Sequence, residues 1–389
     1  MDHYFDSMVA DFVKKDFSDI GVDTRDLRKN ITEMTKEAYH DAKPETCVLC
    51  KVPGKKFCNS HTIPQFVLRT IAQDGKLLDW NAILKSPVVD KEKGMKQAET
   101  FKIICTECDK KEFAEYENPS NYDGPITQKM MQEITLKNLL NPYSKAIKDK
   151  KLFTSLLNAS EHLLDSPLAN LMFESLSVAY IKEKIKATET DIKDYTRQIH
   201  ILYHGKPDQY DVIWKYRLNY TAPIAFQGEI NLVTGFNHEL INNIYDYDEK
   251  NKLKPIELCV FPFLNQTYIL LFLAKRDRHL YRKFIKKFSK IDVNEKMKVI
   301  LLIIFLYSDT FLVSPLLAEE VSKNPKVQKT FSILPDFAGG IPHGVEDVSM
   351  YVSQQAVKEY DLNSYQDVPD FLSEQYSIEH LKADDTENL

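Results

Sequence analysis

The chain is poor in cysteine and glycine, and it carries no large excess of either charge. Its 389 residues include six Cys and 11 Gly, and its formal net charge is −6. So few cysteines argue against a secreted scaffold held by disulfides, which is smaller and denser in cysteine. A mildly acidic chain does not coat nucleic acid by bulk charge, but this balance leaves room for a local basic groove.

Membrane spans, leader peptides and nucleotide-binding loops also lack support. The most apolar stretch, residues 299–317, contains Asp309 and has Pro315 near its end. It therefore favours a buried helix that stops and turns over a bilayer span. The acidic start lacks the basic-then-apolar order of a signal peptide, and neither glycine-rich phosphate-binding pattern occurs. We expect a cytoplasmic protein in a reducing compartment.

The residues that are present suit a folded protein of two or three domains. Hydrophobic residues make up 43% of the chain, and 21 Phe and 20 Tyr supply material for a core. Apolar residues recur at helical spacing within 125–200 and 277–321. Between them, residues 208–274 consist of β-branched and aromatic runs broken by turns, which predict strands. The expected fold class is α+β.

These patterns predict three segments and two local features. In the run IELCVFPFLNQTYILLFLA we expect two strands joined at Asn265-Gln266, and the polar tail after residue 375 is expected to fray. The three segments are a helical arm (1–40), a zinc-knuckle module (41–125) and a larger mixed helix and strand domain of unknown role (126–389).

Four of the six cysteines form two Cys-x-x-Cys pairs. Cys47 and Cys50 make the first pair, and Cys105 and Cys108 make the second, 54 residues further on. Zn²⁺ prefers four tetrahedral ligands, and one Cys-x-x-Cys turn places two thiolates on the same ion. The pairs therefore predict a structural zinc site. Four buried apolar cysteines would not need this spacing, and no thioredoxin-like pattern supports a redox pair.

The remaining cysteines and one histidine have open roles. Cys259 lies in a strand-like run and is expected in the core, whereas Cys58 is a core residue or a further zinc ligand. His61 follows the first pair and precedes Ile63-Pro64. A histidine in this place can be a metal ligand, a group that orients a ligand, a catalytic base or a satisfied buried residue.

The order of these motifs resembles a group of HNH endonucleases. Members of that group carry Cys-x-x-Cys, then Ser-His-x-Ile-Pro-x-Phe, then Cys-x-x-Cys-(Glu/Asp)-x3-Phe-x2-Tyr-Glu. Here Ser60–Phe66 reads Ser-His-Thr-Ile-Pro-Gln-Phe, and Cys105–Glu117 reads Cys-Thr-Glu-Cys-Asp-x3-Phe-x2-Tyr-Glu. The likeness covers about 75 residues of the 389. It implies a ββα-metal core, in which a β-hairpin and a following helix grip one divalent cation.

The resemblance also implies roles for single residues. His61, on the first strand, would be the general base that takes a proton from the attacking water. Asp109, on a helix starting just after Cys108, would ligate Mg²⁺ or a similar catalytic cation, which would stabilise the charge on the phosphate. Ser60 and Glu117 are possible partners of the groups that bind the metal. Glu117, eight residues beyond Asp109 and about two turns along the expected helix, is far for sharing one ion, so a structural role is the alternative for it. Ser60, however, stands where the family usually has a metal ligand, and the family's central Asn has no counterpart before Cys105.

The most basic stretch of the chain lies far from these motifs. Residues 274–290, AKRDRHLYRKFIKKFSK, predict an amphipathic basic helix. Such a helix can follow a phosphate backbone, or it can be the solvated face of a helix over a core. The candidate nucleic-acid contacts are Arg278, Arg282, Lys283, Lys286 and Lys287.

Together these features predict a metal-dependent endonuclease of HNH type that hydrolyses phosphodiester bonds of DNA, with zinc as a structural cofactor and Mg²⁺ or a similar cation as a catalytic one. DNA is the expected partner and RNA an alternative. Defence against phage or mobile DNA is suggested by family analogy alone. The competing hypothesis is a catalytically inactive, zinc-stabilised protein that binds nucleic acid or acts as a scaffold.

Overall fold

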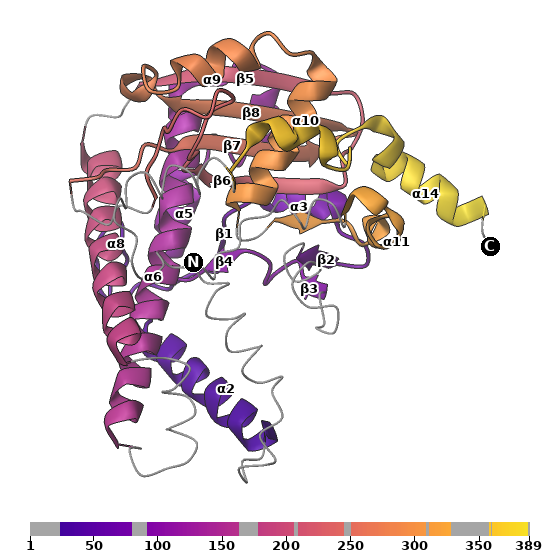
Figure 1. The fold of residues 1–389 in the computed structure, drawn as a ribbon. Coiled ribbons are helices and arrows are strands. Elements are labelled where there is room, and N and C mark those ends of the chain that lie inside the picture. The colour runs from indigo at the N-terminus through magenta and orange to yellow at the C-terminus, as the bar shows by residue number, and fades with distance from the viewer. Residues whose placement is uncertain are drawn as a thin grey trace. The chain divides into compact units, whose positions relative to one another are not determined.

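The chain folds into two units of mixed helix and strand, which confirms the expected α+β class. Unit 1 comprises Met1–Ser60, Phe101–Glu112 and Leu139–Lys206, and unit 2 comprises the remaining residues. Figure 1 shows the fold of this computed structural model. The structure describes residues 24–79, 92–162, 178–205, 209–244, 250–308, 311–327, 358 and 360–387.

Unit 1 is mainly helical. Its apolar core joins three helices, with Ala38 from the first, Leu152 and Leu156 from the second and Ile181 from the third. The helical spacing of the leucines in this part of the chain is thus confirmed, while the later leucines, from 163 to 171, lie outside the described residues. The helices are α2 (Thr24–Asp41), α5 (Thr106–Glu112), α6 (Gln128–His162), whose first turns belong to unit 2, and α8 (Val178–His204).

Unit 2 is built on one seven-stranded sheet in which every neighbouring pair is antiparallel. The strand order is β3-β2-β9-β6-β7-β8-β5, so β5 forms one edge. The strands are β2 (Lys76–Asp79), β3 (Glu92–Gly94), β5 (Tyr210–Leu218), β6 (Ile224–Ile230), β7 (Ile256–Phe263), β8 (Gln266–Ala274) and β9 (Leu312–Val313).

The predicted hairpin exists, but its turn lies one residue earlier than expected. Phe263 pairs with Gln266, so the loop consists of Leu264 and Asn265. Both loop residues have positive φ, 49° and 58°. This is the backbone of a type I′ turn, whose twist matches that of the flanking strands. The pairing of the two strands therefore determined the position of the turn, and the weak turn preference of Asn-Gln did not.

Helices cover both faces of this sheet. On one face, α9 (Arg282–Phe288) and α10 (Val293–Tyr307) pack against residues such as Leu258 and Leu271 (Figure 1). On the other face, Phe66 of α3 (Gln65–Ile71) contacts the ring of Phe263 edge-on. Helix α10 is buried from Val299 to Leu306, which confirms the predicted buried helix, although Asp309 lies outside the described residues. Within the described part of the chain, no helix has the length and apolarity that crossing a bilayer requires.

The C-terminal tail is helical, not frayed as its polarity suggested. In α14 (Ile378–Glu387), Ile378 and Leu381 are buried one turn apart. Ser377 caps the helix by accepting the backbone N–H of His380. Tertiary burial of two apolar side chains thus outweighs the polar composition of the segment. The remaining short elements are η2 (Pro119–Tyr122), η3 (Lys275–Asp277), η4 (Pro315–Leu317), α11 (Ala318–Lys323), η5 (Leu362–Asp367) and η6 (Glu374–Tyr376).

Candidate metal centre

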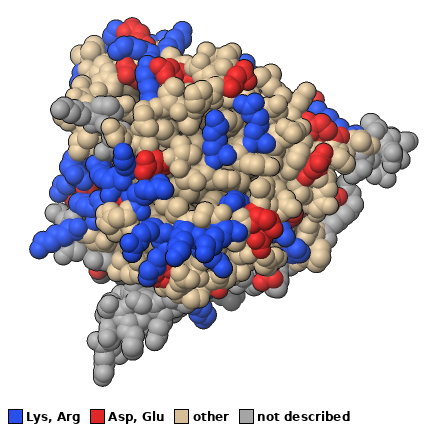
Figure 2. All heavy atoms as spheres, turned by 90° about the horizontal axis from the view of Figure 1, so that it is seen from above, with Lys and Arg blue, Asp and Glu red and all other residues tan. Residues whose placement is uncertain are grey.

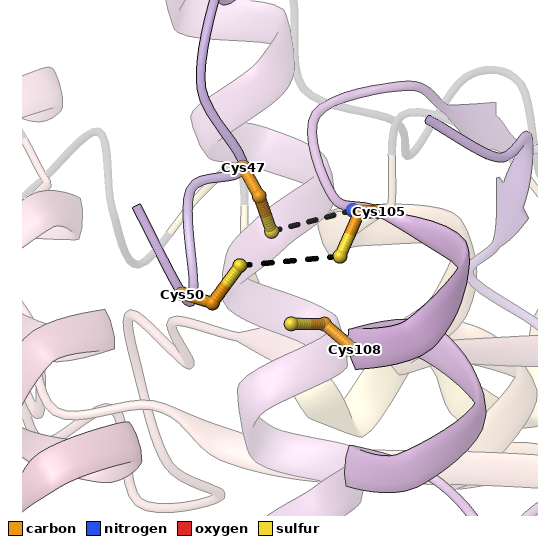
Figure 3. Close-up of side chains that lie close together, drawn as sticks. All are labelled: Cys47, Cys50, Cys105 and Cys108. Atoms are coloured by element: carbon orange, nitrogen blue, oxygen red, sulfur yellow. Dashed lines mark hydrogen bonds between the residues drawn. The ribbon is translucent and has the colours of Figure 1, made fainter. Parts of the chain in front are cut away.

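The two Cys-x-x-Cys pairs come together in unit 1. The Sγ atoms of Cys47, Cys50, Cys105 and Cys108 all lie within 4.8 Å of one another. Figure 3 shows the four side chains pointing toward a common centre, with Cys50 Sγ and Cys105 Sγ 4.0 Å apart. Three of the four cysteines are buried and Cys50 is half-buried. The sequence prediction that these four residues meet is confirmed.

Local backbone geometry aims the sulfurs of each pair at one side. The first pair sits in a turn closed by the N–H of Lys51 donating to the carbonyl of Cys47 at 2.9 Å, with Lys51 at a φ of 59°. The second pair occupies the first turn of α5, where the N–H of Asp109 donates to the carbonyl of Cys105 at 3.0 Å. The helix begins at Thr106, so the expectation that it starts after Cys108 was wrong. Both sulfurs of the second pair project from this turn.

Backbone hydrogen bonds join the two distant pairs. The N–H of Val48 donates to the carbonyl of Ile103 at 3.0 Å. The N–H of Cys105 donates to Cys47 Sγ at 3.3 Å, as Figure 3 marks. An N–H aimed at sulfur stabilises a thiolate more than a neutral thiol, because its dipole faces the negative charge. The backbone is therefore arranged for charged sulfur at this centre.

The donor set fits Zn²⁺. A tetrahedral ion with Zn–S bonds of about 2.3 Å separates its sulfurs by about 3.8 Å, close to the observed spacing. In the described structure, burial and contacts with the other three thiols raise the pKa of the Cys108 thiol. A bound divalent cation would instead lower the pKa of its thiol ligands, because metal binding displaces thiol protons. A cluster of four thiols, three of them buried, is best explained by a shared metal ion.

The other two cysteines stay outside this group. Cys58 donates its S–H to the carbonyl of Ile104 at 3.6 Å and is half-buried, and it is not part of the four-sulfur cluster. Cys259 is fully buried in β7, as predicted. Its pKa is raised well above the usual value by burial and then by the nearby carboxyl of Glu257. Neither cysteine is a zinc ligand in this geometry.

Two side chains that the motifs did not reveal border the cluster. The hydroxyl of Tyr203, on α8, is hydrogen-bonded to Cys108, and burial is the main reason why its pKa is raised. Lys55 binds Glu107 at 2.8 Å, and that bond, together with the nearby thiols of Cys105 and Cys50, raises the pKa of its ammonium. A hydroxyl donor beside the sulfurs would partly offset the double negative charge of a four-thiolate zinc site, whereas the charge of Lys55 is already matched by Glu107.

His61 lies on the two-residue strand β1 (Ser60–His61), which pairs with β4 (Thr100–Phe101). Within unit 2, each of its two ring nitrogens contacts one polar group. Its Nε2 lies 3.1 Å from the carbonyl oxygen of Met95, and its Nδ1 lies 3.2 Å from the side-chain nitrogen of Gln65. The side chain is 7% exposed.

These contacts define the tautomer of His61. A carbonyl can only accept, so Nε2 carries the hydrogen and donates it to Met95. Arg69 can only donate, and its Nη2 lies 3.1 Å from Gln65 Oε1, so the Gln65 amide must present its N–H to His61. Nδ1 is therefore the basic nitrogen, and it accepts a hydrogen bond from Gln65. The sequence motif included Gln65, but its helical i, i+4 position relative to His61 is the signal that would have revealed this contact.

Asp109 lies in unit 1 on α5, where the hydroxyl of Ser60 donates to its Oδ1 at 2.6 Å. This bond is short for a hydroxyl donor and is typical of one to a charged carboxylate. Ser60 and Asp109, which the resemblance places near the same site, are therefore in direct contact. Because His61 is the next residue along the chain, the same strand supplies both the serine and the histidine.

Glu117 is placed differently from the expectation. Helix α5 ends at Glu112, so Glu117 does not lie two turns along the same helix as Asp109. In unit 2, its Oε1 lies 3.0 Å from Nζ of Lys137, whose side chain has no exposed surface. The Lys137 ammonium also sits 3.8 Å from the centre of the Phe113 ring. A buried lysine needs a carboxylate partner, so Glu117 has a structural role here.

The described residues do not assemble a site for a second, hard cation as completely as they assemble the four-cysteine cluster. Among the described residues, the four cysteines are the one group of three or more His, Cys, Asp or Glu side chains close enough to share an ion. Mg²⁺ commonly binds through one or two carboxylates, water and substrate phosphate. Asp109 alone would therefore supply only part of such a site, and the structure does not by itself build one.

The five predicted nucleic-acid contacts lie in unit 2, and all five side chains are exposed. The helix that carries most of them is shorter than predicted, because it begins at Arg282 and follows the separate 3-10 turn η3. Comparison of the chain with known protein families, curated proteins and solved structures found no match.

Proposed function

We propose that this protein is a zinc-stabilised, metal-dependent endonuclease of HNH type that hydrolyses phosphodiester bonds of DNA, with His61 as its general base. The observation that carries the proposal is the hydrogen-bond chain from Arg69 through Gln65 and His61 to Met95. It leaves Nδ1 as the nitrogen that accepts a proton. A base held in one tautomer by its other nitrogen is the arrangement that general-base catalysis requires.

The proposed chemistry uses this chain directly. A water molecule that displaces the Gln65 amide from Nδ1 would give its proton to His61 as its oxygen attacks phosphorus. The phosphodiester P–O bond opposite the attacking water would break, and the leaving oxygen would take up a proton from solvent water. The carbonyl of Met95 would then stabilise the imidazolium through the Nε2–H bond. Asp109 is the proposed protein ligand of Mg²⁺ or a similar cation, which would supply charge stabilisation at the phosphate. Zinc would hold α5 and the segment before β1 in place.

The second candidate is a zinc-stabilised binding protein without turnover. It is favoured by the engagement of Asp109 with the Ser60 hydroxyl, where the resembling family has a further metal ligand. A carboxylate satisfied by a serine has less need of a cation. Defence against phage or mobile DNA stays a prediction from the resemblance alone.

A plasmid-nicking assay separates the two candidates. Supercoiled DNA is incubated with the full chain, with and without Mg²⁺ or Mn²⁺, alongside His61→Ala and Asp109→Asn. General-base catalysis contributes about 10²–10⁴-fold, so His61→Ala should lower the rate by at least 100-fold while keeping its zinc. Asp109→Asn should raise the metal concentration needed for half-maximal nicking.

The matched control is His40→Ala, because His40 is an exposed histidine whose side chain is 75% accessible at the end of α2. It should nick like the unmodified chain. Equal nicking by His61→Ala would contradict the assignment of the base. No metal-dependent nicking by any form, with zinc bound and the fold intact, would favour the binding protein.

A further inference from the structure

A group of exposed cations on unit 2 plays no part in the metal centre or the His61 contacts. They lie on η3, on α9 and directly beside them, and we call them the η3–α9 basic surface. Figure 2 looks down on the side of the molecule that carries α9 and β5, where Lys and Arg side chains gather. The surface consists of Lys275, Arg276, Arg278, Arg282, Lys283, Lys286, Lys287 and Lys290, all exposed.

The packing of α9 explains why these side chains face solvent. Phe284 and Phe288 are buried, and their rings stack against each other with centroids 5.5 Å apart. Phe284 also stacks on Phe236 at 5.6 Å. With this face anchored in the core, the cations at positions 282, 283, 286 and 287 occupy the opposite face. Residues four apart on a helix are separated by about 6 Å along its axis, so the charges form two short rows.

Most of this charge is not neutralised within the described structure. Arg276 lies 3.6 Å from Asp277, and Arg278 lies 3.5 Å from Asp211. The other six side chains form no ion pair with a described residue. Eight cations thus stand against one acidic residue between 275 and 290, in a chain whose net charge is −6. Uncompensated charge of one sign in one place is a costly arrangement unless an anion binds there.

We propose that the η3–α9 basic surface binds the phosphate backbone of double-stranded DNA. The choice of DNA rests on the proposed function; the need for a polyanion rests on the charge alone. Binding here would add affinity without reading sequence, because point charges on flexible lysines contact phosphates rather than base edges. The surface would hold substrate on unit 2 while chemistry takes place elsewhere.

The surroundings of the cations favour a duplex over other polyanions. Proteins that hold unpaired strands stack bases on exposed aromatic rings, whereas the aromatic residues of this segment, Tyr281, Phe284 and Phe288, are all buried. Helices that lie on membranes insert an apolar face. The apolar face of α9 is committed to the protein core, and Leu280, 39% exposed, is the large apolar side chain left beside it.

The test measures binding and salt dependence on the full chain carrying His61→Ala, which separates binding from cleavage. A fluorescent 20-base-pair duplex is titrated at several KCl concentrations without added Mg²⁺. The test variant combines Lys283→Gln, Lys286→Gln and Lys287→Gln. Each lost phosphate contact should make the slope of log K against log salt shallower by ~0.9. The slope of the triple variant should therefore be shallower by about two to three, and its affinity near 0.1 M salt should be at least tenfold lower.

The control variant removes three exposed lysines from α8 instead, Lys182→Gln, Lys186→Gln and Lys193→Gln. It carries the same net charge as the test variant and should bind the duplex nearly as tightly as the unmodified chain. Replacing Lys283, Lys286 and Lys287 by Arg keeps the charge and should restore binding. Thermal unfolding should be unchanged in all three variants, since every altered side chain is solvent-exposed.

Four outcomes would overturn the proposal: equal binding by test variant and unmodified chain, equal losses in both glutamine variants, tighter binding of a single strand or an RNA duplex, or tighter binding of vesicles rich in anionic lipid. Failure of the nuclease assignment looks different. In that case the duplex binds through this surface, with the expected salt slope, but the chain with His61 intact does not cut DNA.

Discussion

At the scale of single residues, hydrogen-bonding partners decide what each polar side chain can do. His61 is restricted to one tautomer because Met95 offers only an acceptor and Arg69 directs the Gln65 amide. Lys137 is fully buried and is matched by Glu117. A histidine or a lysine can serve catalysis in one protein and structure in another, so the identity of a residue alone does not determine its role.

The four-cysteine cluster gives a prediction for one sulfur. Cys105→Ser removes one of the four proposed thiolate ligands but keeps the backbone N–H that donates to Cys47 Sγ. Because structural zinc in small modules contributes on the order of 10 kcal/mol, we expect zinc content to fall well below one ion per chain and thermal stability to drop. Elemental analysis and a thermal melt measure both.

The control is Cys58→Ser, which lies close in sequence but outside the four-sulfur cluster. It should keep its zinc, with a smaller loss of stability. Full zinc content in Cys105→Ser would rule out a four-thiolate site.

At the scale of elements, β6 and β7 place two carboxyls opposite each other inside unit 2. Glu229 pairs with Glu257 across the strands. Burial raises the pKa of Glu257 to about 7, against the effect of its hydrogen bond from Asn138, and burial with the Glu257 charge raises the pKa of Glu229 to about 8. Glu257 is buried and Glu229 is half-buried, both on the face of the sheet opposite α10, where strand alternation puts them.

These carboxyls predict a pH-dependent stability. Their pKa values in the folded state lie above the ordinary 4.5, so the folded protein holds more protons than the unfolded chain between pH ~5 and ~8. The stabilisation is complete below the unfolded pKa and is lost as pH rises through about 7 to 8. Each pKa unit corresponds to roughly 1.4 kcal/mol, so the free energy of unfolding should fall by a few kcal/mol over this range.

Urea unfolding at pH 5.5, 7 and 8.5 measures this effect. Glu257→Gln keeps an oxygen to accept from Asn138 but cannot ionise, so its stability should fall less with pH and exceed that of the unmodified chain at pH 8.5. Glu374→Gln, an exposed position, should reproduce the unmodified profile. Parallel pH profiles for Glu257→Gln and the unmodified chain would show that the pair does not ionise in this range.

At the scale of the whole molecule, the two units differ in what stabilises them. Unit 2 has a large apolar core between its sheet and α10. In unit 1, the described helical cluster contains five buried residues, further apolar side chains such as Val48, Leu49 and Ile104 are buried near the cysteines, and all four clustered cysteines belong to this unit. A metal should stabilise unit 1 more than unit 2, because its helical cluster supplies less apolar burial to offset the entropy of ordering the chain.

Removing zinc should therefore loosen unit 1 selectively. After treatment with a strong chelator, hydrogen exchange should accelerate in peptides covering 46–60 and 101–112. Peptides from β7 and β8 should keep their protection, because the inner strands of the sheet hydrogen-bond on both edges. Hydrogen exchange with mass spectrometry gives both readings in one sample. Equal loss of protection in β7 would show that the metal stabilises the whole chain and not one unit.

The sequence by itself was enough to predict features that depend on near neighbours. The Cys-x-x-Cys spacing identified Cys47, Cys50, Cys105 and Cys108 as a candidate metal site, because each pair lies in a local turn. The continuous apolar run identified the buried helix α10, and the β-branched runs identified the central strands. Each of these features follows from side-chain chemistry and periodicity within about 20 residues.

Only the tertiary structure decided which distant groups meet. Ser60 and Asp109, 49 residues apart, form one short hydrogen bond. Met95, 34 residues from His61, sets its tautomer. Lys137 engages Glu117, and two glutamates from separate strands face each other. No local pattern encodes such partners, because they depend on how the strands pair and on what the helices bury, and both are determined by the fold as a whole.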